Sequence, residues 1–153
     1  MLSRLLSSAV LFMAVHAAWA KPPAEWRFQD WNAAVAAAEK SNKPLFVLFG
    51  FEECPYCEHL YRHGMDNAEL RAKYQASAVL TYYDTRAHRA NDVVRLPGGT
   101  TTNHAQFIQQ FRAYPTPSWV FMSTKGTVLR ANRGSKSTSA QLLRDLELAQ
   151  AAQ

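Results

Sequence analysis

Short apolar segments alternate with segments of helical periodicity along this chain. Residues 45–49 are continuously apolar, which is typical of a strand that is buried on both faces of a sheet. Apolar segments at 78–83 and 118–122 predict two further strands. A Lys-Gly pair after the third segment predicts a turn, and residues 127–131 then predict a fourth strand that pairs with the third as a hairpin.

Five helices are predicted between and around these strands. In the first, Trp31, Ala34, Val35 and Ala38 form one apolar stripe, and Asp30 is placed to cap it. The predicted helices span 31–40, 54–63, 66–74 and 103–113, and the last begins near residue 139.

Local capping preferences support two of these helices. Pro55 suits the first turn of the second helix, and Gly64 ends it. Asp66 and Glu69 resemble a capping box at the start of the third helix.

The predicted elements run in the order helix, strand, helix, helix, strand, helix, strand, strand, helix. Alternation in the first half implies a parallel pair of strands, and the hairpin adds an antiparallel edge. The expected fold class is therefore α/β, with a mixed central sheet of about four strands flanked by helices on both faces. Residues 86–102 lack periodicity and contain a Pro-Gly-Gly sequence, so this segment is predicted to be a loop insertion.

The first 20 residues have the three regions of a secretory signal peptide. Arg4 gives a positive start, residues 5–15 are largely apolar, and Ala18-Trp19-Ala20 is a small-x-small cleavage site. The apolar segment is too short to span a bilayer. We therefore expect residues 1–20 to be removed on export and residues 21–153 to form one soluble periplasmic domain.

Charge and cysteine content narrow the range of functions that the sequence supports. The chain has 17 lysines and arginines against 12 aspartates and glutamates, but no dense basic run with interleaved aromatic residues, so nucleic acid is not an expected partner. Its only two cysteines are Cys54 and Cys57. A disulfide between them would close a loop too small to stabilise the fold, so the pair indicates redox chemistry or metal binding.

The position of the pair favours disulfide exchange, which needs a thiolate that attacks and a second thiol that resolves the mixed disulfide. Cys54 lies at the start of a predicted helix, where free backbone N–H groups and the helix dipole favour negative charge. The pKa of its thiol is therefore expected to lie below that of a free thiol. Cys57 follows one turn later on the same side. We assign Cys54 as the nucleophile and Cys57 as the more buried resolving thiol.

Two segments resemble members of the thioredoxin superfamily. Residues 46–57, Phe-Val-Leu-Phe-Gly-Phe-Glu-Glu-Cys-Pro-Tyr-Cys, look like that family's strand, loop and active-site helix start. Residues 116–122, Thr-Pro-Ser-Trp-Val-Phe-Met, resemble its cis-proline segment, and a Lys-Gly turn follows. The similarity extends from Trp26 to Leu148. The nearest counterparts are periplasmic thioredoxin-like proteins, which include sulfur-oxidation-associated thioredoxins and the catalytic domains of disulfide isomerases.

The resemblance implies an exported thiol–disulfide oxidoreductase that exchanges disulfides with protein partners and needs no cofactor. It implies that Pro117 is the cis-proline opposite the cysteines, with Pro115 as the alternative, and that Thr116 presents backbone groups to an extended substrate chain. Tyr56, in the spacer between the cysteines, is expected to contribute to the substrate surface. The expected partners are protein disulfides or dithiols and a membrane or periplasmic redox protein, and the domain is expected to be a monomer.

Two features depart from the thioredoxin pattern. Thioredoxins place a buried acid six residues before the first cysteine, where it helps to move protons, and that position is Leu48 here. The Pro-Tyr spacer matches glutaredoxins, whose potentials lie near about −200 to −230 mV against about −270 mV for thioredoxin, so it indicates a less reducing pair. The spacing leaves the direction of electron flow open; of the two directions, we expect reduction of substrates.

A metal carrier is the alternative function. Cys54, Cys57, His59 and His63 supply nitrogen and sulfur donors on one short segment, and such donors could hold zinc or copper. Cys57 and His59 are two residues apart and therefore face different sides of a helix, which departs from the usual zinc-ligand spacings. If the cysteine pair exchanges disulfides, we expect no metal to be bound at this site. A third possibility is a non-catalytic interaction module, which would not turn over a disulfide substrate.

Overall fold

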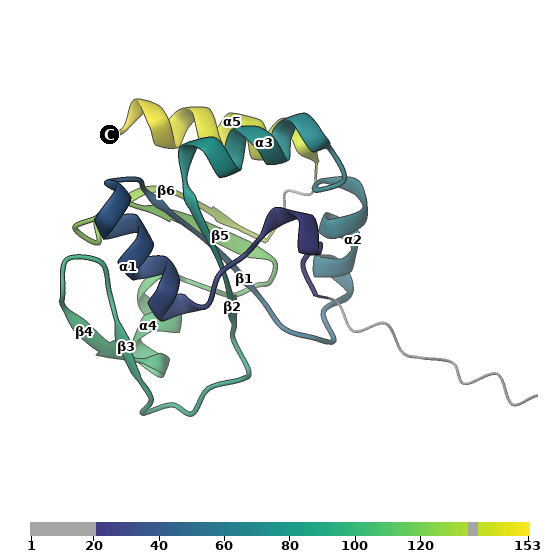
Figure 1. Cartoon of the computed structure of the whole chain (residues 1–153). Coiled ribbons are helices and arrows are strands. Elements are labelled where there is room, and N and C mark those ends of the chain that lie inside the picture. The colour runs from purple at the N-terminus through teal and green to yellow at the C-terminus, as the bar shows by residue number, and fades with distance from the viewer. Residues whose placement is uncertain (1–20, 135–137) are drawn as a thin grey trace, which may run out of the picture.

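A mixed sheet of four strands forms the centre of the protein (Figure 1). The computed structural model describes residues 21–134 and 138–153; the predicted signal peptide, residues 1–20, lies outside the described residues. The strands are β1 (Leu45–Gly50), β2 (Val79–Asp84), β5 (Ser118–Met122) and β6 (Val128–Arg133), in the order β2-β1-β5-β6. β1 is parallel to β2 and antiparallel to β5, and β5 is antiparallel to β6. The predicted parallel pair and antiparallel hairpin are both confirmed.

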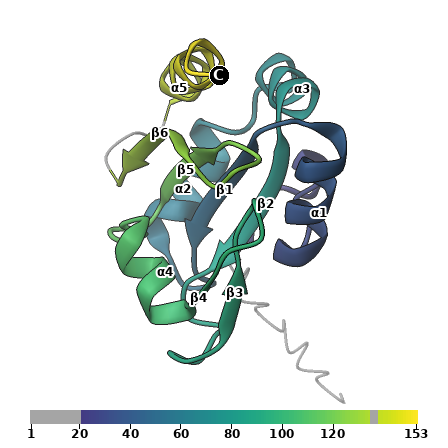
Figure 2. The same ribbon diagram turned by 90° about the vertical axis from the view of Figure 1, so that its left-hand side faces the viewer.

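Within the described residues, five α-helices cover the two faces of this sheet. α1 (Trp31–Ser41) and α4 (His104–Gln110) pack on one face. α2 (Pro55–His63), α3 (Ala68–Ser77) and α5 (Ser139–Ala151) pack on the other. α3 and α5 lie side by side at the top of Figure 1 and stay together in the view turned by 90° (Figure 2). A short 3-10 turn, η1 (Ala24–Trp26), precedes α1.

β1 supplies both hydrophobic cores because its side chains alternate between the two faces of the sheet. Phe46 and Leu48 enter the core under α2, α3 and α5, whereas Leu45, Val47 and Phe49 enter the core under α1 and α4. Each of the five side chains is at most 1% exposed. The prediction of a strand buried on both faces is therefore confirmed.

Two helices differ from the prediction at their ends. α3 is capped by Asn67, whose side chain accepts a hydrogen bond of 2.9 Å from the backbone N–H of Leu70, and not by Asp66. Neighbouring Asn and Asp satisfy the same capping preference, so the sequence alone does not separate them. α4 ends at Gln110, earlier than predicted, because the chain turns at Arg112, which has a left-handed φ of 49°.

The segment 86–102, predicted as a loop insertion, instead carries a second, smaller sheet. β3 (Val93–Arg95) and β4 (Thr101–Asn103) pair antiparallel, and Val94 is buried in the core under α1 and α4. The two glycines of the Pro-Gly-Gly turn between them have positive φ values of 84° and 88°. Strands of three residues are too short to show the alternation that identifies a strand from sequence.

His104 connects this smaller sheet to the main one. It is the first residue of α4 and is 7% exposed. Its ring Nδ1 shares a hydrogen bond of 2.9 Å with the hydroxyl of Tyr83 on β2. Burial lowers the pKa of His104, and the nearby His88 adds to this effect. The folded protein therefore favours the neutral ring.

We expect acid to destabilise the protein through His104. Its pKa is lower in the folded protein than in the unfolded chain, where it is about 6.5, so the unfolded chain binds more protons as the pH falls below that value. This contribution to stability is fully present above about pH 6.5 and is lost as the pH falls. Urea unfolding across this range measures it.

His104→Asn is expected to weaken this pH dependence, whereas the same change at the exposed His63 is expected to preserve it. Identical pH dependence in the parent and in His104→Asn would show that another group is responsible.

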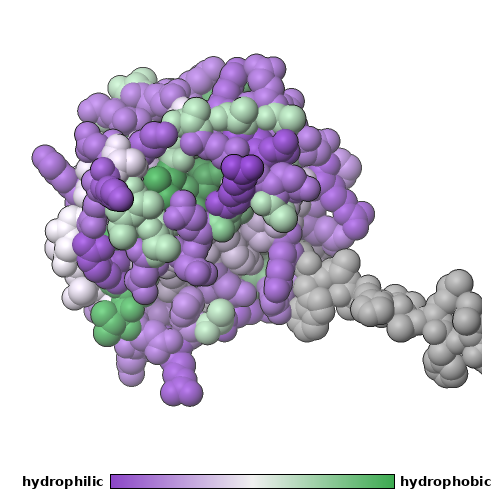
Figure 3. Space-filling view, in the orientation of Figure 1, coloured by the Kyte–Doolittle hydropathy of each residue, from purple (hydrophilic) through white to green (hydrophobic). Residues whose placement is uncertain are grey.

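No helix among residues 21–134 and 138–153 is long and apolar enough to cross a membrane. The face shown in Figure 3 is largely hydrophilic, with smaller apolar areas near its middle. The exposed large apolar side chains of the described residues are Tyr56, Val93, Tyr114, Val128 and Leu148. Of these, Tyr56 lies between the two cysteines, and Tyr114 lies two residues before Thr116.

Candidate active site

The two cysteines lie at the start of α2, shortly after the strand that contributes to both cores. β1 ends at Gly50, a short turn follows, and Cys54 is the N-cap of α2 with Pro55 in the first helical position. Proline at this position costs no hydrogen bond, because N–H groups in the first turn have no partner in the helix. Cys54 and Cys57 form a disulfide with their Cα atoms 5.2 Å apart, within the usual range.

The sulfur of Cys54 takes the place of an N-cap oxygen. The backbone N–H of Cys57 donates a hydrogen bond of 3.1 Å to Cys54 Sγ. This N–H group and the positive end of the helix dipole favour a thiolate over a thiol at Cys54 once the disulfide is reduced. Both side chains are buried, at 2% exposure for Cys54 and 0% for Cys57, so Cys54 is the one that solvent touches.

The segment before β5 faces the cysteines. The hydroxyl oxygen of Thr116 lies 3.4 Å from Cys54 Sγ, within hydrogen-bond distance for sulfur, and Thr116 is 7% exposed. The register of β1 against β5 pairs Phe49 with Ser118. The end of β1 and the residues before β5 are therefore brought to the same edge of the sheet as Cys54.

Two peptide bonds in this segment are cis. They precede Pro115 and Pro117. The sequence presents the two prolines as alternatives, whereas the structure has both bonds in the cis form. Both prolines flank Thr116, but Pro117 is buried whereas Pro115 is exposed. Pro117 is therefore the one that lies inside the protein.

The strand position that carries an acid in thioredoxins is apolar and buried here. Leu48 is 0% exposed and pairs with Tyr82 in the parallel register of β1 and β2. Tyr61 lies on α2 four residues after Cys57 and therefore shares its helix face. Neither tyrosine was predicted as a site residue. The helical spacing could have indicated Tyr61, but no local pattern connects Tyr82 with the cysteines.

Comparison with known proteins identifies the fold. A family model described as a thioredoxin-like domain matches residues 31–150. The chain belongs to the thioredoxin-like family. No curated protein matches the sequence.

Solved structures are similar to this thioredoxin-like domain at low sequence identity. A thioredoxin from Thermus thermophilus has a TM-score of 0.61 and 19% identity, covering 78% of this chain and 83% of that one. A DsbH oxidoreductase has a TM-score of 0.59 and 13% identity, covering 94% and 95%. The reduced C-terminal domain of Neisseria meningitidis DsbD has a TM-score of 0.55 and 14% identity, covering 80% and 93%. These similarities show a shared fold.

Arg86 contacts the turn before the cysteines of this thioredoxin-like domain, which sequence reasoning did not predict. Its guanidinium lies 3.6 Å from the centre of the Phe51 ring, in the turn that precedes Cys54. The contact joins two segments far apart in sequence, so no spacing indicates it. Tyr56, in contrast, is 75% exposed and projects from the spacer between the cysteines.

The histidines of α2 differ from Cys57 in their exposure to solvent. His59 and His63 are exposed, with ring centroids 4.5 Å apart, whereas Cys57 is fully buried. Across the described ranges 21–134 and 138–153, no three His, Cys, Asp or Glu side chains are grouped closely enough to hold a metal ion. Titration of the reduced protein with zinc or Cu(I) tests the metal-carrier alternative directly.

Proposed function

We propose that this thioredoxin-like protein is a thiol–disulfide oxidoreductase that exchanges disulfides with protein partners through Cys54 and Cys57. The observation that carries the proposal is the disulfide at the N-terminus of α2, with Thr116 beside Cys54. A disulfide that closes only a two-residue spacer contributes little to folding, so chemistry is the reason for the pair.

The two cysteines have different roles in this reaction. The Cys54 thiolate attacks one sulfur of a substrate disulfide, whose S–S bond breaks, and the other substrate sulfur leaves as a thiolate. Cys57 then attacks Cys54 Sγ, which forms the intramolecular disulfide and releases the second substrate sulfur. The substrate gains two electrons and the cysteine pair loses two. Complete burial of Cys57 suits a thiol whose only target is Cys54.

Substrate binding is proposed at Tyr56, Thr116 and Pro117. Tyr56 offers an exposed aromatic ring at the centre of the site, a type of side chain enriched where proteins meet. Thr116 and Pro117 lie immediately before β5, where backbone groups beside Cys54 favour pairing with an extended segment of the partner. A partner disulfide bound in this way meets the sulfur of Cys54 first.

The proposal includes the cellular location and the direction of exchange. Residues 1–20 carry the regions of an export signal, which supports action in the periplasm. There the protein is proposed to reduce substrate disulfides, with a membrane or periplasmic redox partner returning electrons to the pair. Both thiols lie in one chain, so a monomer is sufficient for the reaction.

Turnover of a protein disulfide tests the proposed function. The domain of residues 21–153 is expected to accelerate reduction of a disulfide-bonded protein by dithiothreitol, and Cys54→Ser is expected to abolish this acceleration. Equal rates for the two proteins would refute the function.

Equilibration against glutathione gives the reduction potential of the pair and tests the direction. A potential near about −270 mV, as in thioredoxin, supports a reductase. A value near about −120 mV, as in strong oxidants, would reverse the proposed direction.

A further inference from the structure

Two phenol side chains lie in the region of the resolving cysteine where thioredoxins carry an acid. Tyr82 is the β2 neighbour of Leu48, and Tyr61 follows Cys57 by one turn of α2. Tyr61 and Cys57 belong to the core under α2, α3 and α5, and Tyr82 packs against that core. Both rings are therefore on the cysteine side of the sheet.

Gly50 shows how closely Tyr82 approaches Cys57. A Cβ atom on residue 50 would lie 3.1 Å from the hydroxyl oxygen of Tyr82 and 3.3 Å from Cys57 Sγ. The oxygen and the sulfur therefore border the same small space, which is open because residue 50 has no side chain.

Both phenol hydroxyls are buried, and within the described part of the chain the only side chain that acts on either hydroxyl through a hydrogen bond is the other phenol. A buried hydroxyl whose proton lacks an acceptor is costly, so its presence requires a reason. Burial raises the pKa of both Tyr61 and Tyr82 well above the usual range of a phenol. Tyr82 raises the pKa of Tyr61 further, whereas a hydrogen bond with Tyr61 lowers that of Tyr82 by less than burial raises it. Each therefore stays protonated at neutral pH and can act as a hydrogen-bond donor.

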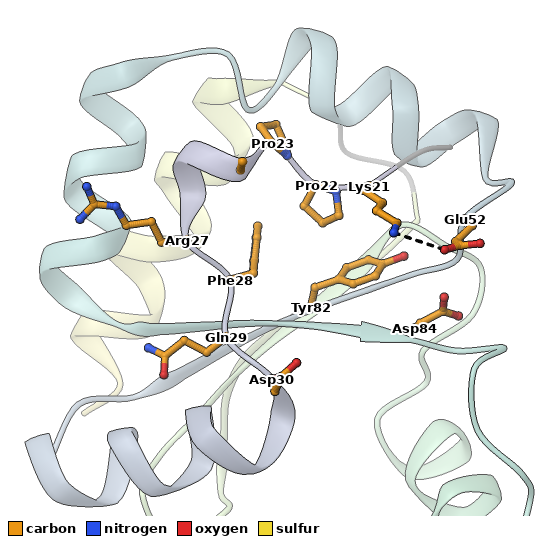
Figure 4. Close-up of a pocket in the computed structure, with 11 residues that line it drawn as sticks. Lys21, Pro22, Pro23, Arg27, Phe28, Gln29, Asp30, Glu52, Tyr82 and Asp84 are labelled. Atoms are coloured by element: carbon orange, nitrogen blue, oxygen red, sulfur yellow. Dashed lines mark ion pairs between the residues drawn. The ribbon is translucent and has the colours of Figure 1, made fainter. Parts of the chain in front are cut away.

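The charged groups around Tyr82 favour the same protonated form. Asp84 on β2 and Glu52 in the turn after β1 both raise the pKa of Tyr82. The Tyr82 ring also lines a pocket of about 540 Å³ (Figure 4). The charged residues of this pocket are Lys21, Arg27, Asp30, Glu52 and Asp84. Lys21 pairs with Glu52 at 3.7 Å across this pocket. Tyr82 therefore borders a charged pocket as well as the space beside Gly50 that Cys57 Sγ also borders.

We propose that the Tyr82 hydroxyl donates a hydrogen bond to Cys57 Sγ when the active-site disulfide is open, and that Tyr61 positions this hydroxyl. The inference rests on the proposed function. Opening the disulfide frees Cys57 Sγ to turn toward the space beside Gly50 that the hydroxyl already borders. A protonated phenol does not accept the thiol proton as a carboxylate base does; it stabilises the thiolate that remains.

The hydrogen bond acts in the resolving step. In the mixed disulfide, Cys57 loses its proton and its sulfur attacks Cys54 Sγ. The bond between Cys54 and Cys57 forms, the bond from Cys54 to the substrate breaks, and the departing substrate sulfur takes up a proton. Protons and electrons balance, and Tyr82 keeps its own proton throughout.

A measurement on Cys57 alone tests the inference without any substrate. In Cys54→Ser, Cys57 is the only cysteine, and its Cβ chemical shift followed against pH gives the midpoint of its ionisation. Adding Tyr82→Phe is expected to raise this midpoint by about one pH unit, because the charged thiolate loses one hydrogen bond. At a pH below the midpoint, this shift reduces the fraction of thiolate about tenfold. An unchanged midpoint would overturn the inference.

Tyr83→Phe is the matched control for this measurement. Tyr83 is the next residue on β2, faces the other core and bonds His104, so its hydroxyl is expected to leave the midpoint unchanged. Gly50→Ala fills the space between Tyr82 and Cys57 and is expected to raise the midpoint as Tyr82→Phe does. Equal shifts in Tyr82→Phe and Tyr83→Phe would indicate a general effect of the sheet and overturn the inference.

The two-cysteine protein supplies a kinetic readout. Tyr82→Phe is expected to slow release of substrate from the mixed disulfide about tenfold near pH 7, with the difference vanishing at high pH where Cys57 ionises unaided. Slowing by the same factor at every pH would indicate a structural defect and contradict the proposed role. If the parent exchanges no disulfides, the proposed function fails, and the Cys57 midpoint still decides the role of Tyr82.

Discussion

Cys57→Ser is expected to accumulate a mixed disulfide through Cys54 when it meets a disulfide substrate. In the parent, Cys57 attacks from one helical turn away, an intramolecular step whose effective concentration is far above that of any dissolved thiol. Removing Cys57 is therefore expected to lengthen the lifetime of the mixed disulfide by at least about a thousandfold. Non-reducing electrophoresis and mass spectrometry, before and after dithiothreitol, measure the adduct.

Cys54→Ser is the control for this experiment, because it also retains a single thiol. The remaining Cys57 is fully buried, so no adduct with a protein substrate is expected. Adducts through Cys57 in the absence of adducts through Cys54 would reverse the two roles. Failure of both variants to form adducts would argue against disulfide exchange altogether.

Phe46→Ala is expected to lower the free energy of unfolding by about 3–5 kcal/mol. Phe46 is 1% exposed on β1, and its ring centroid lies 5.0 Å from that of Tyr74 on α3 and 4.9 Å from that of Phe121 on β5. The neighbours are held by the sheet and by α3, so they can fill only part of the space that the ring leaves. Urea unfolding with the disulfide intact measures the loss.

Leu148→Ala provides the comparison for Phe46→Ala. Leu148 is 39% exposed on α5, and its truncation is expected to change stability by no more than about 0.5 kcal/mol. A loss below about 1 kcal/mol for Phe46→Ala would mean that the core under α3 and α5 collapses into the cavity far more readily than rigid packing allows.

The sheet and the position of the cysteines could be predicted because each is specified locally. Residues 45–49 are apolar at every position, which identifies a strand buried on both faces without knowledge of its partners. Cys54 and Pro55 follow shortly after and have the preferences of a helix start. The prediction of a mixed four-stranded sheet with helices on both faces is confirmed. It could be made because the strands and helices are also specified by local patterns.

The remaining features depend on contacts between distant segments. β3 and β4 are too short to show a pattern, and β3 is held against α1 by the Trp31 indole, which donates a hydrogen bond of 2.8 Å to the carbonyl of Arg95. Tyr82 approaches Cys57 through the register of β1 and β2 and the missing side chain of Gly50. Sequence spacing specifies neither contact, because each one exists only after the strands have paired.

The small ring closed by Cys54 and Cys57 links the reduction potential of the protein to its resistance to urea. Around a cycle of reduction and unfolding, the difference in stability between the two redox forms equals the difference in potential between the folded pair and the same pair in the unfolded chain. A ring this short restrains the unfolded chain little. Most of the difference in stability between the two redox forms therefore arises in the folded state, where the Cys57 N–H and Thr116 face Cys54 Sγ. In a stronger oxidant, the reduced form unfolds at a higher urea concentration than the oxidised form. Urea unfolding curves of the oxidised and the reduced protein therefore rank the reduction potential of this pair against other dithiols without any partner protein.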